Sequence, residues 1–304
     1  MEKELEKIKN QLQSCPSNHI EKISLYQGME LYFFTIKTET TSMQHPELKH
    51  IMEINYCHSG RIGWKMGNGN QIHLGPGDFS LHTLDSCAKS TLCFPTGKYE
   101  GLTLCIDLQE LSAHPPELLS ETGICGEMLY EKFCKNGTFA SFAGNEQTDT
   151  IFSAFYEQSV NLKLAYQKIK SLELLLYLTK MEPNQTSRLT EYQSEQIEIV
   201  RAIHEHLTQN IGQRITIDAL SKQYMINPTT LKEVFKSVYG TSIAAHIKEH
   251  RMELAAQLLL ETNLSIAEIG QRIGYESQSR FTSAFKAYFH TVPKEYRKKH
   301  QMLL

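Results

Sequence analysis

A stretch near the C-terminus, residues 265–297, constrains the fold more than any other part of the chain. Ser265 and Glu268 form a capping-box pattern, which predicts a helix start because the two side chains satisfy free backbone N–H groups. Gly274 can adopt the left-handed conformation that ends a helix and turns the chain. An apolar stripe at four-residue spacing then predicts a second helix. It consists of Phe281, Phe285 and Phe289.

The other face of this second predicted helix is polar. Its side chains are Gln278, Ser279, Thr282, Ser283 and Lys286. A short helix, a glycine turn and a longer helix with a polar outer face form a helix-turn-helix, which presents donors and acceptors to a DNA major groove. The alternative is a pair of helices in an ordinary bundle with a solvated polar face.

A second, degenerate copy of this pattern lies upstream, in residues 215–240. Its aromatic and aliphatic positions match the later copy, and Asn227-Pro228 is a good helix start because proline needs no N–H partner there. Residues 242–261, between the copies, have the composition of one long helix. Two such units held apart by a helix could enter successive major grooves about 34 Å apart, which favours DNA binding over the bundle.

The last third of the chain resembles the DNA-binding domain of the AraC/XylS family of bacterial transcription factors. The resemblance is carried by GYESQSRFTSAFKAYF followed by VPKEYR, which is similar to the family signature. Two positions depart from the family pattern. Met225 stands at the usual turn glycine of the first unit, and His290 stands at the glycine after the second recognition helix. Each departure is expected to cost on the order of 1 kcal/mol if the backbone keeps a positive φ.

The resemblance implies which side chains face double-stranded DNA. In the first recognition helix they are Thr229, Thr230, Lys232, Glu233 and Lys236. In the second they are Gln278, Ser279, Thr282, Ser283 and Lys286. Gln278 could bond adenine, Lys232 could donate to guanine, and Glu233 could accept from cytosine. The resemblance also implies an activator that works with RNA polymerase, although the residues themselves do not separate activation from repression.

Length and composition set the broad class. A chain of 304 residues predicts two domains, and 40% hydrophobic with 21% charged residues is typical of globular proteins. No apolar run approaches the about 18 residues that span a bilayer, and the charged N-terminus lacks a signal-peptide core. Seven cysteines without a CxxC pair predict reduced thiols. We therefore expect a cytoplasmic protein with no membrane contact.

Charge is divided unevenly along the chain. From Arg188 onward there are 15 Lys and Arg against 12 Asp and Glu, a formal charge of +3, and the preceding part carries −6. A modestly basic C-terminal region is consistent with DNA binding. Arg297, Lys298 and Lys299 are either phosphate contacts or a solvated charged end.

The region from Ile23 to Leu108 predicts short strands. Aromatic and β-branched runs such as ELYFFTIKT, HIMEINYCHSG and EGLTLCIDL alternate with glycine-containing turns, which predicts an antiparallel barrel or sandwich. The LGPGDF turn, residues 74–79, is similar to the inter-strand turn of the cupin-like barrels that form the sensor of many family members. The fold class is thus α+β, with a cupin-like antiparallel β-barrel, a helical region and an all-α domain with two helix-turn-helix units.

The predicted barrel is expected to bind an effector rather than to catalyse. Histidines at 58, 73 and 82 lie near Glu53, but no H-x-H pair occurs, so we expect no catalytic residue, no metal and no cofactor. Candidate effector-binding residues are His58, Arg61, Trp64 and His82. The CHSGR and GPGDFS segments resemble sensors that respond to iron–siderophore complexes, although the sequence does not name the effector.

From about Thr148 the pattern becomes helical, and a stripe of Ile169, Leu172, Leu175 and Leu176 needs cover from the barrel or from a partner subunit. Because this region often makes the dimer contact in the resembled family, a homodimer is expected. Residues 182–190 are polar and contain a proline, which predicts a linker. The expected domains are 1–145 for sensing, 146–187 for dimerisation and linker, and 188–304 for DNA binding.

These observations predict a sequence-specific transcriptional regulator whose promoter binding is modulated by a small-molecule effector in the N-terminal domain. A cupin-type metalloenzyme that carries a DNA-binding tail is the alternative from another class. A third possibility is a regulator controlled by a protein partner or by its abundance.

Overall fold

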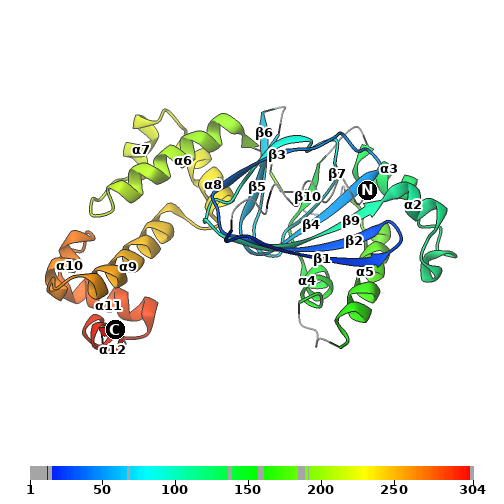
Figure 1. Ribbon diagram of the computed structural model, residues 1–304. Helices are drawn as coiled ribbons and strands as arrows, with labels where there is room; N and C mark the ends of the chain where they lie inside the picture. Colours follow the sequence, from blue (N-terminus) through cyan, green and yellow to red (C-terminus); the bar gives the residue numbers. More distant parts are fainter. Residues whose placement is uncertain are drawn as a thin grey trace. The chain divides into compact units, whose positions relative to one another are not determined.

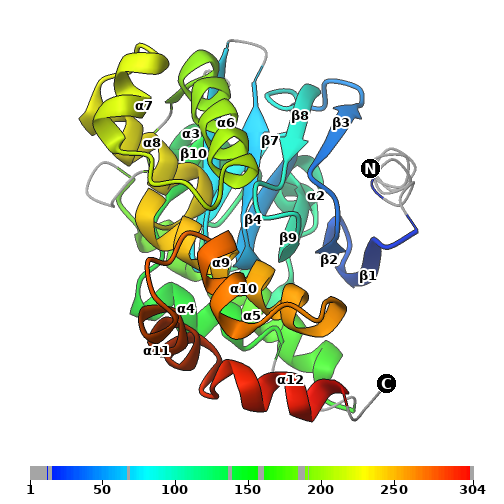
Figure 2. The same cartoon turned by 90° about the vertical axis from the view of Figure 1, so that its left-hand side faces the viewer.

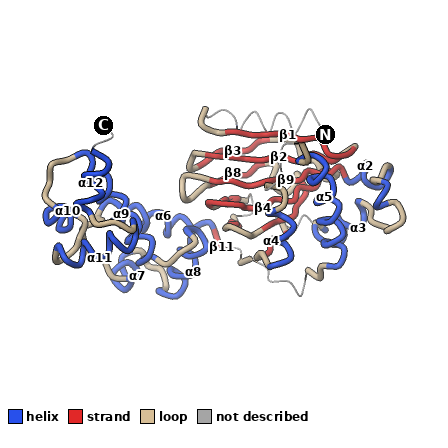
Figure 3. The backbone as a smooth tube through the Cα atoms, turned by 90° about the horizontal axis from the view of Figure 1, so that it is seen from below, coloured by secondary structure: helices blue, strands red, loops and turns tan. Residues whose placement is uncertain are grey.

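The computed structural model describes residue 12 and residues 16–66, 69–135, 139–156, 161–183, 189–190 and 192–301. The chain divides into two compact units, Met1–Ser194 and Glu195–Leu304. All described strands lie in the first unit, and the second is helical (Figures 1 and 3). The fold class is therefore α+β, as the sequence predicts. The predicted domain boundaries at 145/146 and 187/188 stay predictions, and residues 184–188 lie outside the described part.

The first unit contains two antiparallel sheets. The larger has the strand order β1-β2-β9-β4-β7-β10, and the smaller has the order β11-β6-β5-β8-β3. The strands are β1 (His19–Tyr26), β2 (Met29–Ile36), β3 (Thr40–Gln44), β4 (Ile51–Gly60), β5 (Ile62–Lys65), β6 (Asn70–Leu74), β7 (Phe79–Thr83), β8 (Lys89–Cys93), β9 (Tyr99–Asp107), β10 (Ala140–Phe142) and β11 (Tyr192–Gln193). Strands β3 and β8 are short and polar, which is why the sequence pattern does not reveal them.

The two faces of the larger sheet bury different cores. Along β4, Met52 and Ile54 point to one face and pack with the helices, whereas Ile51 and Cys57 point to the other face. The alternation follows from the two-residue period of a strand. The second face joins a core with β5, β6 and β8 of the smaller sheet, so the space between the sheets is an interior.

Helices cover the outer face of the larger sheet. They are α2 (Leu108–Ala113), α3 (Gly126–Phe133), α4 (Glu146–Ser153) and α5 (Lys163–Lys180), with a short 3₁₀ turn at Glu117–Leu119. Figure 1 shows α4 and α5 on the side of β1, and α5 contacts that strand. Among the described residues, no helix is both long and apolar enough to span a bilayer.

The second unit is built from helices. They are α6 (Ser194–Gln209), α7 (Ile217–Gln223), α8 (Pro228–Tyr239), α9 (Ile243–Glu261), α10 (Ile266–Arg272), α11 (Gln278–Phe289) and α12 (Pro293–Gln301). The long helix α9 runs between the pairs α7–α8 and α10–α11, with one pair toward each end (Figures 1 and 2). This arrangement confirms the predicted order of two helix-turn-helix units joined by a helix.

The predicted helix starts are confirmed in detail. Ser265 and Glu268 form a reciprocal capping box at α10, Asn227 caps α8 with Pro228 in the first turn, and Ser242 caps α9. These are local hydrogen bonds between residues two or three apart, so the sequence alone specifies them.

The turns also follow the sequence-based expectation. Gly274 has a φ of 87°, and the two departures from glycine keep the same left-handed conformation, with φ of 51° at Met225 and 57° at His290. The left-handed backbone geometry is therefore retained at both positions, although L-residues with a Cβ disfavour it.

Candidate nucleic-acid interface and interior cavity

The inner faces of α8 and α11 are buried, which leaves their other faces to solvent. Leu231 and Phe235 of α8 and Phe281 and Phe285 of α11 are each 0% exposed. Phe289 is only half buried and packs at the edge of the same core. The spacing of the apolar residues along each helix thus determines which side chains are buried and which are exposed and able to contact a ligand.

The predicted DNA-facing residues lie on the outer faces. In α8, Thr229, Lys232, Glu233 and Lys236 are exposed, and Thr230 is half buried. In α11, Gln278, Ser279, Ser283 and Lys286 are exposed, and Thr282 is half buried. All ten therefore lie where a groove of DNA could meet them, in the first three turns of the two longer helices.

One basic residue on α11 was not among the predicted contacts. Arg280 has a side chain that is 71% exposed, and it pairs with Glu276 at 2.5 Å. Its backbone N–H donates to Ser277, the N-cap, so Arg280 lies in the first turn of the helix. Its position in the sequence, between the predicted contact Ser279 and the buried Phe281, could have identified Arg280 as a further candidate for DNA contact.

Two arginines have structural roles in the second unit. Arg297, which the sequence offered as a phosphate contact, donates from Nε to Leu259 O at 2.9 Å and from Nη2 to Leu264 O at 2.7 Å. Arg251 donates in the same way to the carbonyls of Ile211 and Gln213. Each guanidinium thus holds the loop that precedes the first helix of a helix-turn-helix pair.

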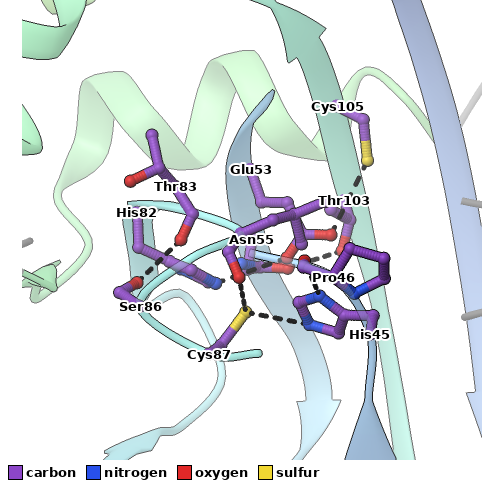
Figure 4. Close-up of polar contacts among 11 residues, drawn as sticks. His45, Pro46, Glu53, Asn55, His82, Thr83, Ser86, Cys87, Thr103 and Cys105 are labelled. Carbon is purple, nitrogen blue, oxygen red and sulfur yellow. Dashed lines mark hydrogen bonds and ion pairs between the residues drawn. The ribbon is translucent and has the colours of Figure 1, made fainter. Parts of the chain in front are cut away.

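A row of polar side chains crosses the interior face of the larger sheet (Figure 4). Strand β4 lies between β9 and β7, and its Glu53 pairs in register with Cys105 on one side and His82 on the other. His82 Nε2 is 3.3 Å from Glu53 Oε2, and the Cys105 thiol donates to Glu53 Oε1 at 3.8 Å. Residues distant in sequence are thereby brought onto one buried surface.

Two more side chains reach this row from loops. Cys87 is in the segment between β7 and β8, and its Sγ atom lies 3.6 Å from His45 Nε2 (Figure 4). The other ring nitrogen of His45, Nδ1, lies 3.0 Å from the carbonyl oxygen of Pro46. Burial raises the pKa of the Cys87 thiol well above its usual range. Glu53, His82 and Cys87 offer donor atoms that all lie within 4.8 Å of one another.

A small cavity opens beside these groups. Its volume is about 60 Å³. Its polar lining comes from His45, Glu53, Asn55, Cys87, Ser90 and Thr103. Asn55 Oδ1 accepts a hydrogen bond from the Thr103 hydroxyl at 2.6 Å, but Asn55 Nδ2 has no hydrogen-bond partner among the described residues. Ser80 Oγ, which is across from Asn55 on the neighbouring strand β7, has none either. Buried polar atoms without partners cost free energy, so this interior is suited to a polar ligand or water.

The structure separates the four candidate effector residues. Trp64 lines the cavity, and His82 packs against both Trp64 and Phe139. His58 is exposed and stacks on Tyr156, and Arg61 lies outside the lining of the cavity. Sequence reasoning missed His45 and Cys87 because nothing in the local pattern places these loop residues next to β4. It also missed Asn55, which is on β4 itself, because the partners of Asn55 lie on the neighbouring strands β7 and β9.

The apolar stripe of α5 is split between core and surface. Leu172 and Leu175 are buried against the sheet, whereas Ile169 is 57% and Leu176 is 40% exposed. The expectation of one continuous stripe is therefore wrong, because the helix buries only one side. The exposed residues share their own face at helical spacing. They are Leu162, Tyr166, Ile169 and Leu176.

Comparisons with known proteins agree on the C-terminal region. A family described as a helix-turn-helix domain matches residues 220–299. The chain is 33% identical over 130 residues to the HTH-type transcriptional regulator ExsA of Pseudomonas aeruginosa, covering 43% of this chain and 46% of that protein. It is 36% identical over 111 residues to the xylose operon regulatory protein of Escherichia coli K12, covering 36% and 28%.

Among solved structures, the C-terminal domain of AraT, a response regulator from Geobacillus stearothermophilus, is 33% identical with a TM-score of 0.32. The match covers 33% of this chain and 84% of that one. The matched region spans less than half the length of the two curated relatives.

Proposed function

Since the chain carries a helix-turn-helix domain of the AraC/XylS family, we propose that the protein is a sequence-specific DNA-binding regulator of transcription. The observation that carries the proposal is the pair of exposed polar helix faces, on α8 and α11, at the two ends of α9. We further propose that the protein is located in the cytoplasm, where the DNA is, and that RNA polymerase is a partner.

Each recognition helix is proposed to lie in a major groove. Gln278, at the first position of α11, would bond adenine N6 and N7, and Lys232 of α8 would donate to guanine. Lys286 and Lys236 lie in the last turns of their helices, where a cation can neutralise a phosphate. Loss of a base contact and loss of a phosphate contact are expected to change DNA binding in different ways, so experiments can distinguish the two roles.

The test begins with selection of preferred sites from random duplex DNA by the full chain. Gln278→Ala should cost about 1–3 kcal/mol on the preferred site and relax the preference at one base pair. Lys286→Ala should weaken binding to preferred and scrambled DNA alike and lower the salt slope by about one unit. Lys98→Ala removes the same charge from an exposed turn of the first unit and should change neither quantity.

Two outcomes count against these assignments. Equal weakening of both DNAs by Gln278→Ala would mean that Gln278 reads no base, and the assignment of α11 as a recognition helix would be wrong. Failure of the unaltered chain to enrich any sequence from the random pool would reject sequence-specific binding altogether.

The interior between the sheets is proposed to receive the effector. The support is the polar lining at Glu53, Asn55 and Cys87, together with buried polar atoms that lack partners. A cavity of about 60 Å³ is far below the about 300–1,000 Å³ of a drug-sized pocket. This volume favours a small effector over an iron–siderophore complex. Glu53→Gln should abolish any ligand-induced thermal shift and leave DNA binding without ligand intact.

One observation favours the alternative, a metalloenzyme with a DNA-binding tail. Carboxylate, imidazole and thiolate donors from Glu53, His82 and Cys87 approach within 4.8 Å of one another, and such a mixed set can hold a divalent transition metal. Metal analysis of the purified chain decides between the two functions. Stoichiometric metal that is lost in Cys87→Ser, together with turnover of a substrate, would support the enzyme.

A homodimer is proposed through the exposed face of α5. Ile169 and Leu176 lie one above the other on that face, together with Leu162 and Tyr166. Several exposed apolar side chains on one helical face are typical of protein interfaces.

A further inference from the structure

Three histidines gather in the second unit, away from the polar faces of α8 and α11. His204 comes from α6, and His246 and His250 come from α9. Their ring centroids are 5.0 Å apart for His204 and His246, 5.5 Å for His204 and His250, and 4.6 Å for His246 and His250. One nitrogen of each ring lies within 4.8 Å of the others.

The pair on α9 is close to the geometry of a metal chelate. His246 and His250 are four residues apart, so their side chains share one helix face. Their Nε2 atoms are 3.1 Å apart. Two nitrogens bound to one tetrahedral Zn²⁺ at about 2.0–2.1 Å lie roughly 3.3 Å from each other, and three such rings have centroids roughly 5 Å apart. The spacings of the three rings are therefore close to those of this arrangement.

We propose that His204, His246 and His250 form a binding site for one Zn²⁺ ion, with the fourth position open to water. Three imidazoles and a water are a common zinc ligand set, and nitrogen donors suit this metal. The site goes beyond the proposed DNA-binding function, because no residue of it faces DNA in that proposal.

The surroundings favour metal binding in two respects. His250 Nδ1 lies 3.7 Å from Glu253 Oε2, and a carboxylate at this nitrogen orients a metal-binding imidazole. The His250 side chain is 33% exposed, which gives an ion a path from solvent.

The site would join the two helices that flank the first helix-turn-helix pair, α7–α8. A metal on these rings links α6 to α9. His204 stacks on Tyr239 at 4.5 Å, and Phe235 packs edge-on against His246 at 5.5 Å, so the cluster also contacts the buried side of α8. Zinc binding is therefore expected to stabilise the framework that positions the first recognition helix.

The test uses Co²⁺ as a spectroscopic probe on the full chain after removal of metals with a chelator. The unaltered chain should bind one more equivalent of Co²⁺ than the His250→Gln variant. The additional Co²⁺ should give a visible absorption band but no thiolate-to-cobalt charge-transfer band, because the site contains no cysteine. His250→Cys should regain that equivalent and add a thiolate-to-cobalt charge-transfer band, which only direct ligation produces. His206→Gln, on the opposite side of α6, is the matched control and should bind as the unaltered chain does.

Affinity and stability give a second readout. Glu253→Gln should weaken Zn²⁺ binding by about 10-fold. At about 100 times the dissociation constant, Zn²⁺ should raise the melting temperature of the second unit by about 10 °C, and this rise should disappear in His250→Gln. Both readouts are independent of DNA, so failure here leaves the proposed function intact.

Equal Co²⁺ stoichiometry in the unaltered chain and in His250→Gln would overturn the proposal, and the 3.1 Å contact would then be one hydrogen bond shared by two imidazoles. If His250→Gln does not fold, the charge-transfer band of His250→Cys decides, and its absence also overturns the proposal.

Discussion

The turns of the two helix-turn-helix units should respond to substitution with opposite signs. Gly274 has a φ of 87°, and a Cβ added there would lie 2.5 Å from Gly212 O and 3.0 Å from Arg251 Nη2. Met225 occupies the equivalent turn with a φ of 51°, and its side chain is 93% exposed. Gly274→Ala therefore adds strain and a clash, whereas Met225→Gly removes strain and loses almost no packing.

The magnitudes follow from these contacts. For Gly274→Ala, the left-handed backbone costs about 1–2 kcal/mol. Displacing Arg251 from the carbonyls of Ile211 and Gln213 adds about 1 kcal/mol for each weakened hydrogen bond. The total of roughly 2–4 kcal/mol should lower the melting temperature of the second unit by about 10–20 °C. For Met225→Gly, relief of about 1–2 kcal/mol is partly offset by the entropy of glycine in the unfolded chain, leaving a gain of roughly 0.5–1 kcal/mol.

Urea and thermal unfolding of the full chain, followed by circular dichroism, would measure both changes. Gly97→Ala is a useful control because Gly97 also has a positive φ, of 67°, but nothing lies near the added Cβ. It should cost only the backbone strain, about 1–2 kcal/mol, in the first unit. A Gly274→Ala variant no less stable than the unaltered protein, or a destabilised Met225→Gly, would refute this explanation of the turns.

Further predictions concern the dimer, the half-buried Arg297 and pH. Ile169→Asp should change the sedimentation of the protein from that of a dimer to that of a monomer, with the fold intact, because Ile169 is exposed. Leu172→Asp should instead unfold the first unit, because a charge at this buried position costs several kcal/mol. If the unaltered chain sediments as a monomer, the proposed dimer is wrong. Arg297→Ala should destabilise the second unit by about 2–3 kcal/mol, because it removes the hydrogen bonds to the carbonyls of Leu259 and Leu264. Since Arg297 is expected to contact no phosphate, the salt slope of DNA binding should stay unchanged, and a smaller slope would show that it does. Hydrogen bonds from Ser265 lower the pKa of Glu268, so its stabilisation is present above the unfolded pKa and is lost as pH falls through the folded value. Glu268→Gln should remove that acid-range dependence in pH-dependent unfolding; an unchanged pH profile would mean that the carboxylate contributes nothing.

Local patterns were sufficient for the helical unit. Helix starts at Ser265, Asn227 and Ser242 depend on hydrogen bonds within one turn, so each is specified by residues two or three positions apart. The four-residue aromatic spacing of Phe281 and Phe285 likewise fixes the buried side of α11 and, with it, the exposed side. For the same reason the predicted DNA-facing residues all lie on accessible helix faces.

The strands were less visible. Long, aromatic strands such as β2 and β9 are apparent in the sequence, but β3 and β8 are not, because their residues are short and polar. The stability of a strand depends on its neighbours more than on its own residues. The α5 helix illustrates the same limit in a helix: its sequence is apolar on most sides, and only packing against the sheet decides that Leu172 is core and Ile169 is surface.

The sequence by itself determined the repeat, the helix-turn-helix order and the surfaces that could meet DNA, because these depend on spacings of three or four residues along one chain segment. Tertiary structure alone decided which distant side chains meet. It placed Cys87 and His45 beside Glu53, joined His204 to the pair on α9, and directed Arg297 to backbone carbonyls. The physical reason is that strand register and helix packing set these contacts, and neither leaves a periodic signal in the residues that they bring together.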